Sequence, residues 1–251
     1  MLWNAMGTYE VFQEGQEHSV TMKWLYLLID FFTIFVPLLF SFHPKLRFYK
    51  HWKAFFISNM IIAIVFLIWD SIFVKLGVWG FNKDYILGIN IINLPLEEVL
   101  FFICIPFSCV FTFHCLNIFF SFNWKIKSEN IFVATLCILL FIIGILFHDR
   151  YYTASTFFSL AFVLFILKFI LKVDWLGKLF SIYPILLIPF FIVNGILTGS
   201  GIEHPVVWYN NSENIGVRLL TIPFEDIFYG FELILLNVFL YEYFKRIFVA
   251  K

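Results

Sequence analysis

Seven long apolar stretches, separated by short polar loops, dominate the hydrophobic pattern of this chain. They cover roughly residues 24–42, 54–74, 95–120, 131–147, 153–172, 179–197 and 223–244. Most of them reach the ~17–25 residues that an α-helix needs to cross a bilayer. The pattern therefore predicts an all-α polytopic membrane protein with seven transmembrane helices.

The polar residues before the first apolar stretch follow no helical period. Residues 1–21 are mildly acidic and lack the basic start and apolar run of a signal peptide. We expect a disordered extension or a mis-assigned start, with Met22 as the alternative first residue.

Two polar runs interrupt this pattern in the same way. The third stretch opens with Pro95-Leu96-Glu97-Glu98 and the seventh with Pro223-Phe224-Glu225-Asp226. The preceding loops carry Trp79 and Trp208, which lie 16 and 15 residues before the respective prolines. Because proline suits the start of a helix, each acidic pair is expected in a first helical turn, with Pro95 and Pro223 supporting that position.

This recurrence predicts an internal repeat of three helices. Residues 22–122 would form the first copy with helices 1–3, and residues 153–251 the second with helices 5–7. Residues 123–152 would form a linker that contains helix 4. Because one helix links them, both copies have the same orientation, and a pseudo-twofold axis runs along the membrane normal. The two acidic runs then lie at one depth and face each other.

The distribution of positive charge predicts how the helices are oriented. If the N-terminus is outside, the inner loops and tail hold twelve of the 17 Lys and Arg residues and the outer side holds five. We therefore expect an N-out, C-in protein of the plasma membrane, with both acidic runs at the outer face.

Composition narrows the class further. With 62% apolar and 14% charged residues, the chain has too little charge to cover a soluble domain of 251 residues. Its net charge of zero gives no sign of a nucleic-acid partner. The four cysteines lie inside apolar stretches and form no CxxC pair, so neither a disulfide framework nor a zinc site is predicted.

The paired carboxyls are the candidate chemistry. Neighbouring side chains lie about 100° apart on a helix, so one of each pair can point into the bundle while the other reaches a loop or an adjacent helix. Four carboxyls in an apolar cleft cannot all stay ionised, and such a cluster offers both a proton donor and anions that stabilise a cation. Simple helix capping explains one run equally well, but the repetition of the pair favours function.

Other polar and aromatic residues near the acidic runs are supporting candidates. Asp70 and Asn194 occupy corresponding places in the two repeats, where they would orient a catalytic carboxyl or form hydrogen bonds across helices. Trp79 and Trp208 would either line the cleft and stabilise a cation through their ring faces or belong to an interfacial aromatic belt.

These motifs resemble the flavin-independent, membrane-embedded lycopene cyclases. The segment from Trp69-Asp70 through residues 77–82 to residues 94–102 is similar to the first half of that family. The segments 207–210 and 221–226 are similar to its second half. The resemblance covers about residues 22–243, and the chain looks like the fused form of a type that also occurs as two subunits.

The resemblance implies an intramolecular lyase or isomerase of carotenoid biosynthesis. Protonation of an acyclic end group of lycopene would start a redox-neutral closure to a β-ring, which loss of a proton completes. Glu97, Glu98, Glu225 and Asp226 would share proton donation, proton removal and cation stabilisation. The expected partners are lycopene and membrane lipid, with other carotenoid enzymes as candidates. No cofactor is expected, because the flavin-binding cyclases carry a GxGxxG fingerprint that this chain lacks. No metal is expected either, because the sequence lacks CxxC pairs and aspartate-rich motifs.

Three other classes of membrane protein share parts of this pattern. A small-solute transporter with a 3+1+3 parallel repeat is the main alternative, but it predicts a polar path near mid-membrane rather than acids at one face. A retinal-binding receptor needs a lysine in the last helix, and residues 223–244 contain none. A membrane prenyltransferase needs aspartate-rich magnesium motifs, which the sequence also lacks.

Overall fold

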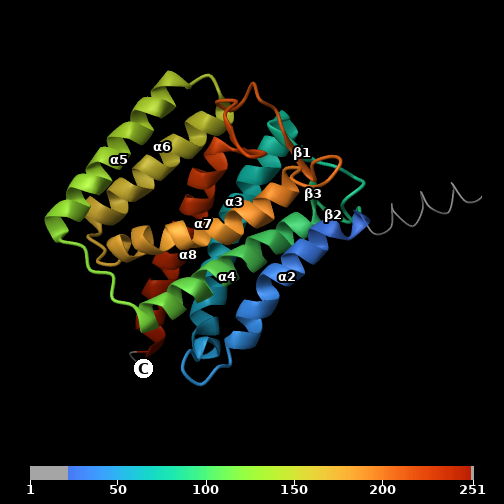
Figure 1. The fold of residues 1–251 in the computed structure, drawn as a ribbon. Helices are drawn as coiled ribbons and strands as arrows, with labels where there is room; N and C mark the ends of the chain where they lie inside the picture. The colour runs from blue at the N-terminus through green and yellow to red at the C-terminus, as the bar shows by residue number, and fades with distance from the viewer. Residues whose placement is uncertain (1–21, 250–251) are drawn as a thin grey trace, which may run out of the picture.

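The computed structural model describes residues 22–249, so the expectation for residues 1–21 lies outside the described part of the chain. Long helices dominate the described residues (Figure 1). They are α2 (Leu25–Phe40), α3 (Trp52–Leu76), α4 (Leu96–Phe119), α5 (Ile126–Leu146), α6 (Tyr151–Phe165), α7 (Leu176–Leu197) and α8 (Phe224–Val249). A short 3-10 helix, η1 (Phe48–His51), precedes α3, and a π-helical turn, η2 (Ile166–Ile170), continues α6.

These helices confirm the all-α polytopic prediction. The six from α3 to α8 are long and apolar enough to cross a membrane, with α6 and η2 counted together as the span Tyr151–Ile170, whereas α2 is apolar but shorter, with 16 residues. Many large apolar side chains face outward, among them Phe32, Leu146 and Ile188 with 65–67% exposure. Exposed apolar side chains in such number are typical of a surface in contact with lipid.

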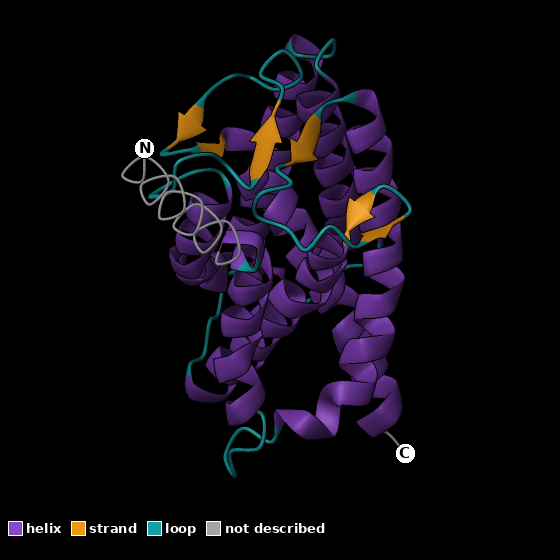
Figure 2. Ribbon diagram, turned by 90° about the vertical axis from the view of Figure 1, so that its right-hand side faces the viewer, coloured by secondary structure: helices purple, strands orange, loops and turns teal. Residues whose placement is uncertain are grey.

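Short strands gather at one end of the bundle, opposite the C-terminus (Figure 2). They are β1 (Trp79–Phe81), β2 (Asn90–Ile91), β3 (Leu94–Pro95), β4 (Val207–Tyr209), β5 (Arg218–Leu219) and β6 (Ile222–Pro223). β2 pairs with β3 and β5 with β6, so that each acidic helix follows a small hairpin. Strands of two or three residues are too short to show a period-two pattern, and the sequence did not predict them.

The antiparallel pairing of β1 with β4 joins the two repeats. Asn82 N–H donates to the Val206 carbonyl at 2.8 Å, and Asn210 N–H donates to the Val78 carbonyl at 2.8 Å. Each of these residues lies 128 positions from its equivalent, the spacing that also separates Pro95 from Pro223. The reciprocal pair is what a twofold axis between the repeats requires. The internal repeat is therefore visible in the backbone as well as in the motifs.

The same spacing corrects the equivalence of the two tryptophans. Trp208 corresponds to Gly80, with which it pairs at the centre of the β1–β4 ladder, and Trp79 corresponds to Val207. A shift of one residue moves a side chain to the other face of a strand. Trp79 accordingly points inward with 5% exposure, whereas Trp208 lies outside with 44%. A Cβ atom on Gly80 would lie 2.4 Å from the Trp208 ring, so the glycine makes room for it.

Candidate active site

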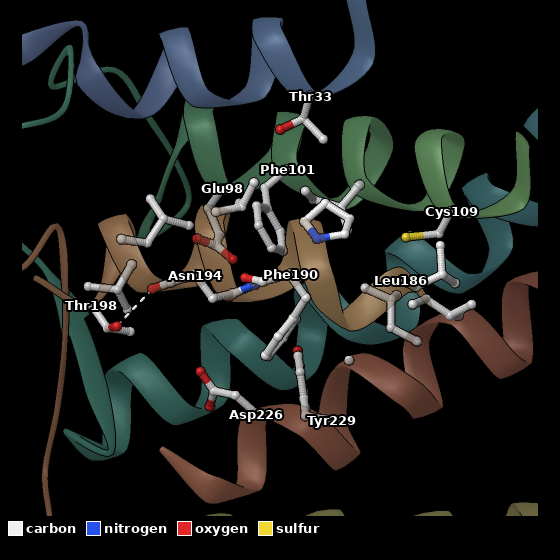
Figure 3. A pocket seen from close by; sticks show the side chains of 18 of the residues that line it. Thr33, Glu98, Phe101, Cys109, Leu186, Phe190, Asn194, Thr198, Asp226 and Tyr229 are labelled. Carbon is white, nitrogen blue, oxygen red and sulfur yellow. Dashed lines mark hydrogen bonds between the residues drawn. The ribbon is translucent and has the colours of Figure 1, made fainter. Parts of the chain in front are cut away.

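A cavity lies between α4, α7 and α8 and reaches the strand end of the bundle. The empty space in it, its open mouth included, is about 1110 Å³. Three carboxyls line it, those of Asp70 on α3, Glu98 on α4 and Asp226 on α8. Figure 3 shows Glu98 and Asp226 at the same end of the cavity, on different helices, with Cys109 and Leu186 toward the other end. The tertiary structure thus brings one carboxyl of each motif to a common space.

Glu98 belongs to the half-site built mainly by the first repeat. The Tyr26 hydroxyl donates a hydrogen bond to Glu98 Oε2 at 2.6 Å. The Asp70 carboxyl lies within hydrogen-bonding reach of Glu98 and accepts a hydrogen bond at 3.1 Å from Tyr229. Because a hydrogen bond between two carboxyl groups needs a proton on one of them, this pair can hold a proton at the cavity wall.

Asp226 belongs to the equivalent half-site of the second repeat. Tyr152 donates to Asp226 Oδ1 at 2.6 Å, as Tyr26 does to Glu98, and Tyr209 donates to Asp226 Oδ2 at 3.0 Å. Burial, with the nearby charge of Asp226, raises the pKa of Tyr209 well above its usual value of 10.0, so this phenol remains a donor. Both oxygens of Asp226 therefore accept hydrogen bonds from protonated phenols.

The two half-sites differ although their backbones correspond. The counterpart of Tyr209 is Phe81, which lines the same cavity but has no hydroxyl. The counterpart of Asp70 is Asn194, which also lines the cavity. The first half-site therefore has a second carboxyl, Asp70, and the second half-site has a second phenol, Tyr209, at a different position.

The structure supports the correspondence of Asp70 with Asn194. Asn93 donates to the carbonyl of Ser71 at 2.9 Å, and Thr221 donates to the carbonyl of Gly195 at 3.2 Å. Asn93 and Thr221 lie 128 residues apart, and Ser71 and Gly195 directly follow the two candidates. The sequence-based alignment of these helix ends therefore agrees with the tertiary contacts.

Glu97 and Glu225 point away from the cavity. Glu97 Oε1 accepts the Leu87 N–H at 2.7 Å, and Glu225 Oε1 accepts the Ile215 N–H at 2.7 Å and the Thr153 hydroxyl at 2.6 Å. Both side chains are fully buried, and neither lines the cavity. The 100° step between neighbouring helix positions separates them from Glu98 and Asp226. Their visible contacts tie the strand-end loops to the starts of α4 and α8.

The two prolines shape those helix starts from just outside the helices. Pro95 is the N-cap rather than the first helical residue, with φ −64° and ψ 152°. It pairs with Asn90 across the β2–β3 hairpin, as Pro223 pairs with Arg218. Neither proline lines the cavity. They fix the direction in which the chain enters each acidic helix.

Aromatic rings enclose the carboxyl end of the cavity. The Trp79 ring centroid lies 5.0 Å from that of Tyr152, 6.0 Å from Tyr209 and 6.3 Å from Tyr229. All four side chains line the cavity, whereas Trp208 does not. The faces of rings that line a cavity attract a cation bound there, and the rings exclude water. Within residues 22–249, no group of three or more His, Cys, Asp or Glu side chains is arranged to hold a metal ion.

Sequence reasoning missed the tyrosines that hold the carboxyls. Tyr229 had a local signal, because it follows Asp226 by three residues and so shares its helix face. Tyr209 stands in the second tryptophan loop. Tyr26 and Tyr152 both lie near the first residue of the opening helix of a repeat, but 72 and 74 residues from their partners, so no local pattern identifies them.

Comparison with known proteins gives one family. A family model described as lycopene cyclase matches residues 23–116 and 149–244, together roughly three quarters of the chain. The first region contains α2 to the last turn of α4, the second runs from α6 into the last turns of α8, and α5 falls between them. The comparisons with curated proteins and with solved structures found no match.

Proposed function

Because the chain belongs to the lycopene cyclase family, a family of carotenoid cyclisation enzymes, we propose that it closes the acyclic ends of lycopene into β-rings. One observation carries this proposal: two buried carboxyls, one from each repeat, face an apolar cavity whose acidic end is ringed by aromatic side chains. A proton donor, a proton acceptor and a water-poor space are what a cation-mediated isomerisation needs.

The reaction balances without an added reactant. A carboxyl O–H bond breaks as its proton adds to C2 of the end group, which leaves a cation at C1. The neighbouring alkene attacks C1 through C6, so the ring closes and the charge moves to C5. Loss of the C6 proton to a carboxylate then forms the ring double bond. The substrate and the product are isomers, and one proton is given and one is recovered.

We assign different roles to the two half-sites. Glu98 is the proton donor, because Asp70 lies within hydrogen-bonding reach and the pair can hold the proton. Asp226 is the proton acceptor and cation stabiliser, because the phenols of Tyr152 and Tyr209 support its carboxylate form. The Trp79 ring and its tyrosine neighbours stabilise the intermediate cations.

Glu97 and Glu225 have a different part in this proposal. The family resemblance implied catalytic roles for all four acids, but the side chains of Glu97 and Glu225 face the loops instead of the cavity. We propose that they are positioning residues. By anchoring the segments at Leu87 and Ile215 to the helix starts, they hold Glu98 and Asp226 at the cavity wall.

We also propose that the protein lies in the plasma membrane with the strand end outside. Among residues 22–249, the loops and helix ends at the opposite end of the bundle carry eleven of the 16 Lys and Arg residues. This bias is typical of the cytoplasmic side. The catalytic carboxyls would then lie near the outer face of the membrane.

Expression in cells that accumulate lycopene tests the proposed function. The wild-type chain is expected to turn red cells orange-yellow and to give products that carry β-rings on chromatography. Glu98→Gln, inserted in the membrane at the same level, is expected to leave the cells red. Unchanged lycopene beside well-inserted wild-type protein would refute the cyclase. Flux of a small solute in liposomes would favour the transporter.

A further inference from the structure

The cavity is elongated along the helix axes. On α4 its lining runs from Glu98 to Thr112, with Phe101, Ile105 and Ser108 between them at helical spacing. At 1.5 Å per residue, these fourteen steps correspond to about 21 Å, a large part of the ~30 Å hydrocarbon core. The cavity therefore extends from the carboxyls deep into the apolar layer, which suits a long, narrow ligand.

The two ends of the cavity differ in how they are closed. At the strand end the carboxyls of Glu98 and Asp226 are buried, behind the β1–β4 ladder. Farther down, Pro189 on α7 both lines the cavity and is exposed on the outer surface. Its neighbours Ile188 and Ile192 face outward with 65% and 61% exposure. The mouth therefore opens on the lipid-facing side of the bundle, away from the loops.

The mouth lies between α7 and α2. Thr33 on α2 lines the cavity, and the adjacent Phe32 faces outward with 65% exposure. α7 lies at the periphery of the bundle, because only 22% of its most apolar segment is buried, whereas 44% of the corresponding segment is buried in α4 and in α8. It also contains Pro184 and Pro189 in its interior, which remove two backbone donors from the helical ladder. A wall of this kind can yield locally when a chain passes beside it.

We propose that the gap between α2 and α7 is a lateral portal that holds the polyene chain of the substrate and leads it into the bilayer. This inference rests on the proposed function, since it takes a linear C40 isoprenoid as the ligand. Such a chain is longer than the cavity, so the part outside needs an apolar environment, which lipid provides. Only the end group reaches the carboxyls. The other end is cyclised after the chain leaves and re-enters in the reverse direction.

A bulky side chain in the portal tests this route. Thr33→Trp places an indole in the mouth, about 10 Å along α2 from the Tyr26 contact with Glu98. Val36→Trp is the matched control, because Val36 lies on the same helix, is 53% exposed and does not line the cavity. Ile105→Phe, on the adjoining helix α4 and three residues before Ser108, which donates a hydrogen bond to the Thr33 carbonyl, provides a second variant should the tryptophan at position 33 impair folding. Each purified protein is assayed for bound lycopene per mole of protein, for lycopene cyclisation and for thermal unfolding.

Thr33→Trp is expected to lower both lycopene retention and cyclisation about tenfold or more, as overpacking of a filled site does. Val36→Trp is expected to stay within about twofold of the wild type. Normal retention in folded Thr33→Trp and Ile105→Phe proteins would overturn the portal, as would a loss of cyclisation with retention unchanged. Wild-type protein that retains lycopene in a Thr33-sensitive manner but never cyclises it would instead refute the proposed function and leave the portal standing.

Discussion

The adjacent carboxyls of one motif are expected to give opposite phenotypes, and the second motif provides the sharpest comparison. Asp226→Asn removes the proposed proton acceptor from the cavity. Its amide can still accept a hydrogen bond from Tyr152 and donate one to Tyr209, so folding is expected to survive. General acid–base groups contribute about 10²- to 10⁴-fold to rate, and we expect cyclisation to fall by that amount.

Glu225→Gln changes the neighbouring residue by the same substitution of amide for carboxyl. Its remaining carbonyl oxygen can accept the Ile215 N–H and the Thr153 hydroxyl, the two hydrogen bonds that Glu225 Oε1 accepts. Hydrogen bonds to charged groups exceed neutral ones by about 1 kcal/mol each, so the variant should lose roughly 2 kcal/mol of stability. For a chain of this size that corresponds to about 4–8 °C in Tm. Activity below the unfolding temperature should stay within about tenfold of the wild type.

Glu225→Ala removes the acceptor altogether. The Ile215 N–H and the Thr153 hydroxyl would then lack a partner where Glu225 is now fully buried. Each such group costs about 1–3 kcal/mol, so the loss should reach roughly 2–6 kcal/mol and lower the amount of inserted protein. The loss of stability in Glu225→Ala thus reports the anchoring role of this side chain separately from the rate of cyclisation.

The assay pairs product analysis in lycopene-producing cells with thermal unfolding of the purified variants in detergent. Protein levels in the membrane are matched before rates are compared. The reasoning fails if Glu225→Gln is as inactive as Asp226→Asn while it unfolds at the wild-type temperature. It fails equally if Asp226→Asn cyclises lycopene at the wild-type rate.

Three further expectations concern the aromatic residues and the orientation. Tyr209→Phe removes one of the two donors to Asp226 and should slow cyclisation about tenfold, the worth of one hydrogen bond to a charged group. The pKa of Tyr209 is raised in the folded protein, so its contribution to the free energy of unfolding is complete below about pH 10 and is lost as the pH rises through the raised value. A pH titration of unfolding should therefore show no loss of stability from this residue at neutral pH. Trp79→Leu should slow cyclisation by about five- to tenfold, because the ring face that stabilises the cation is lost. Trp208→Leu, on the outer side of Gly80, should leave the rate within about twofold of the wild type. Equal effects of the two substitutions on product formation would contradict the placement of the two rings. A reporter active only in the cytoplasm, fused to the C-terminus, should be active, and an inactive fusion in inserted protein would reverse the proposed orientation.

Much of this protein follows from its sequence, because the determining forces are local or depend on composition. Apolar runs of membrane-spanning length form helices wherever they occur, since backbone groups in lipid must pair within their own segment. The sequence spacing also reveals the repeat, and each acidic pair lies in a first helical turn as predicted. The prolines came one position earlier than expected, at the N-cap, because a short hairpin leads into each helix.

Which carboxyl of each acidic motif faces the cavity was decided only by the tertiary structure. The sequence shows that neighbouring carboxyls point in different directions, but it does not show which direction faces the cavity. That depends on partners distant in sequence: Glu98 meets Tyr26 across 72 residues, and Asp226 meets Tyr152 across 74.

The equivalence predicted for the two tryptophans was wrong for a related reason. A spacing of 16 against 15 residues looks equal in a sequence, yet on a paired strand one position turns Trp208 outward and leaves Trp79 in the cavity. Motif content and membrane topology are properties of the chain, whereas the side of a helix or strand that becomes a site is set by what packs against it.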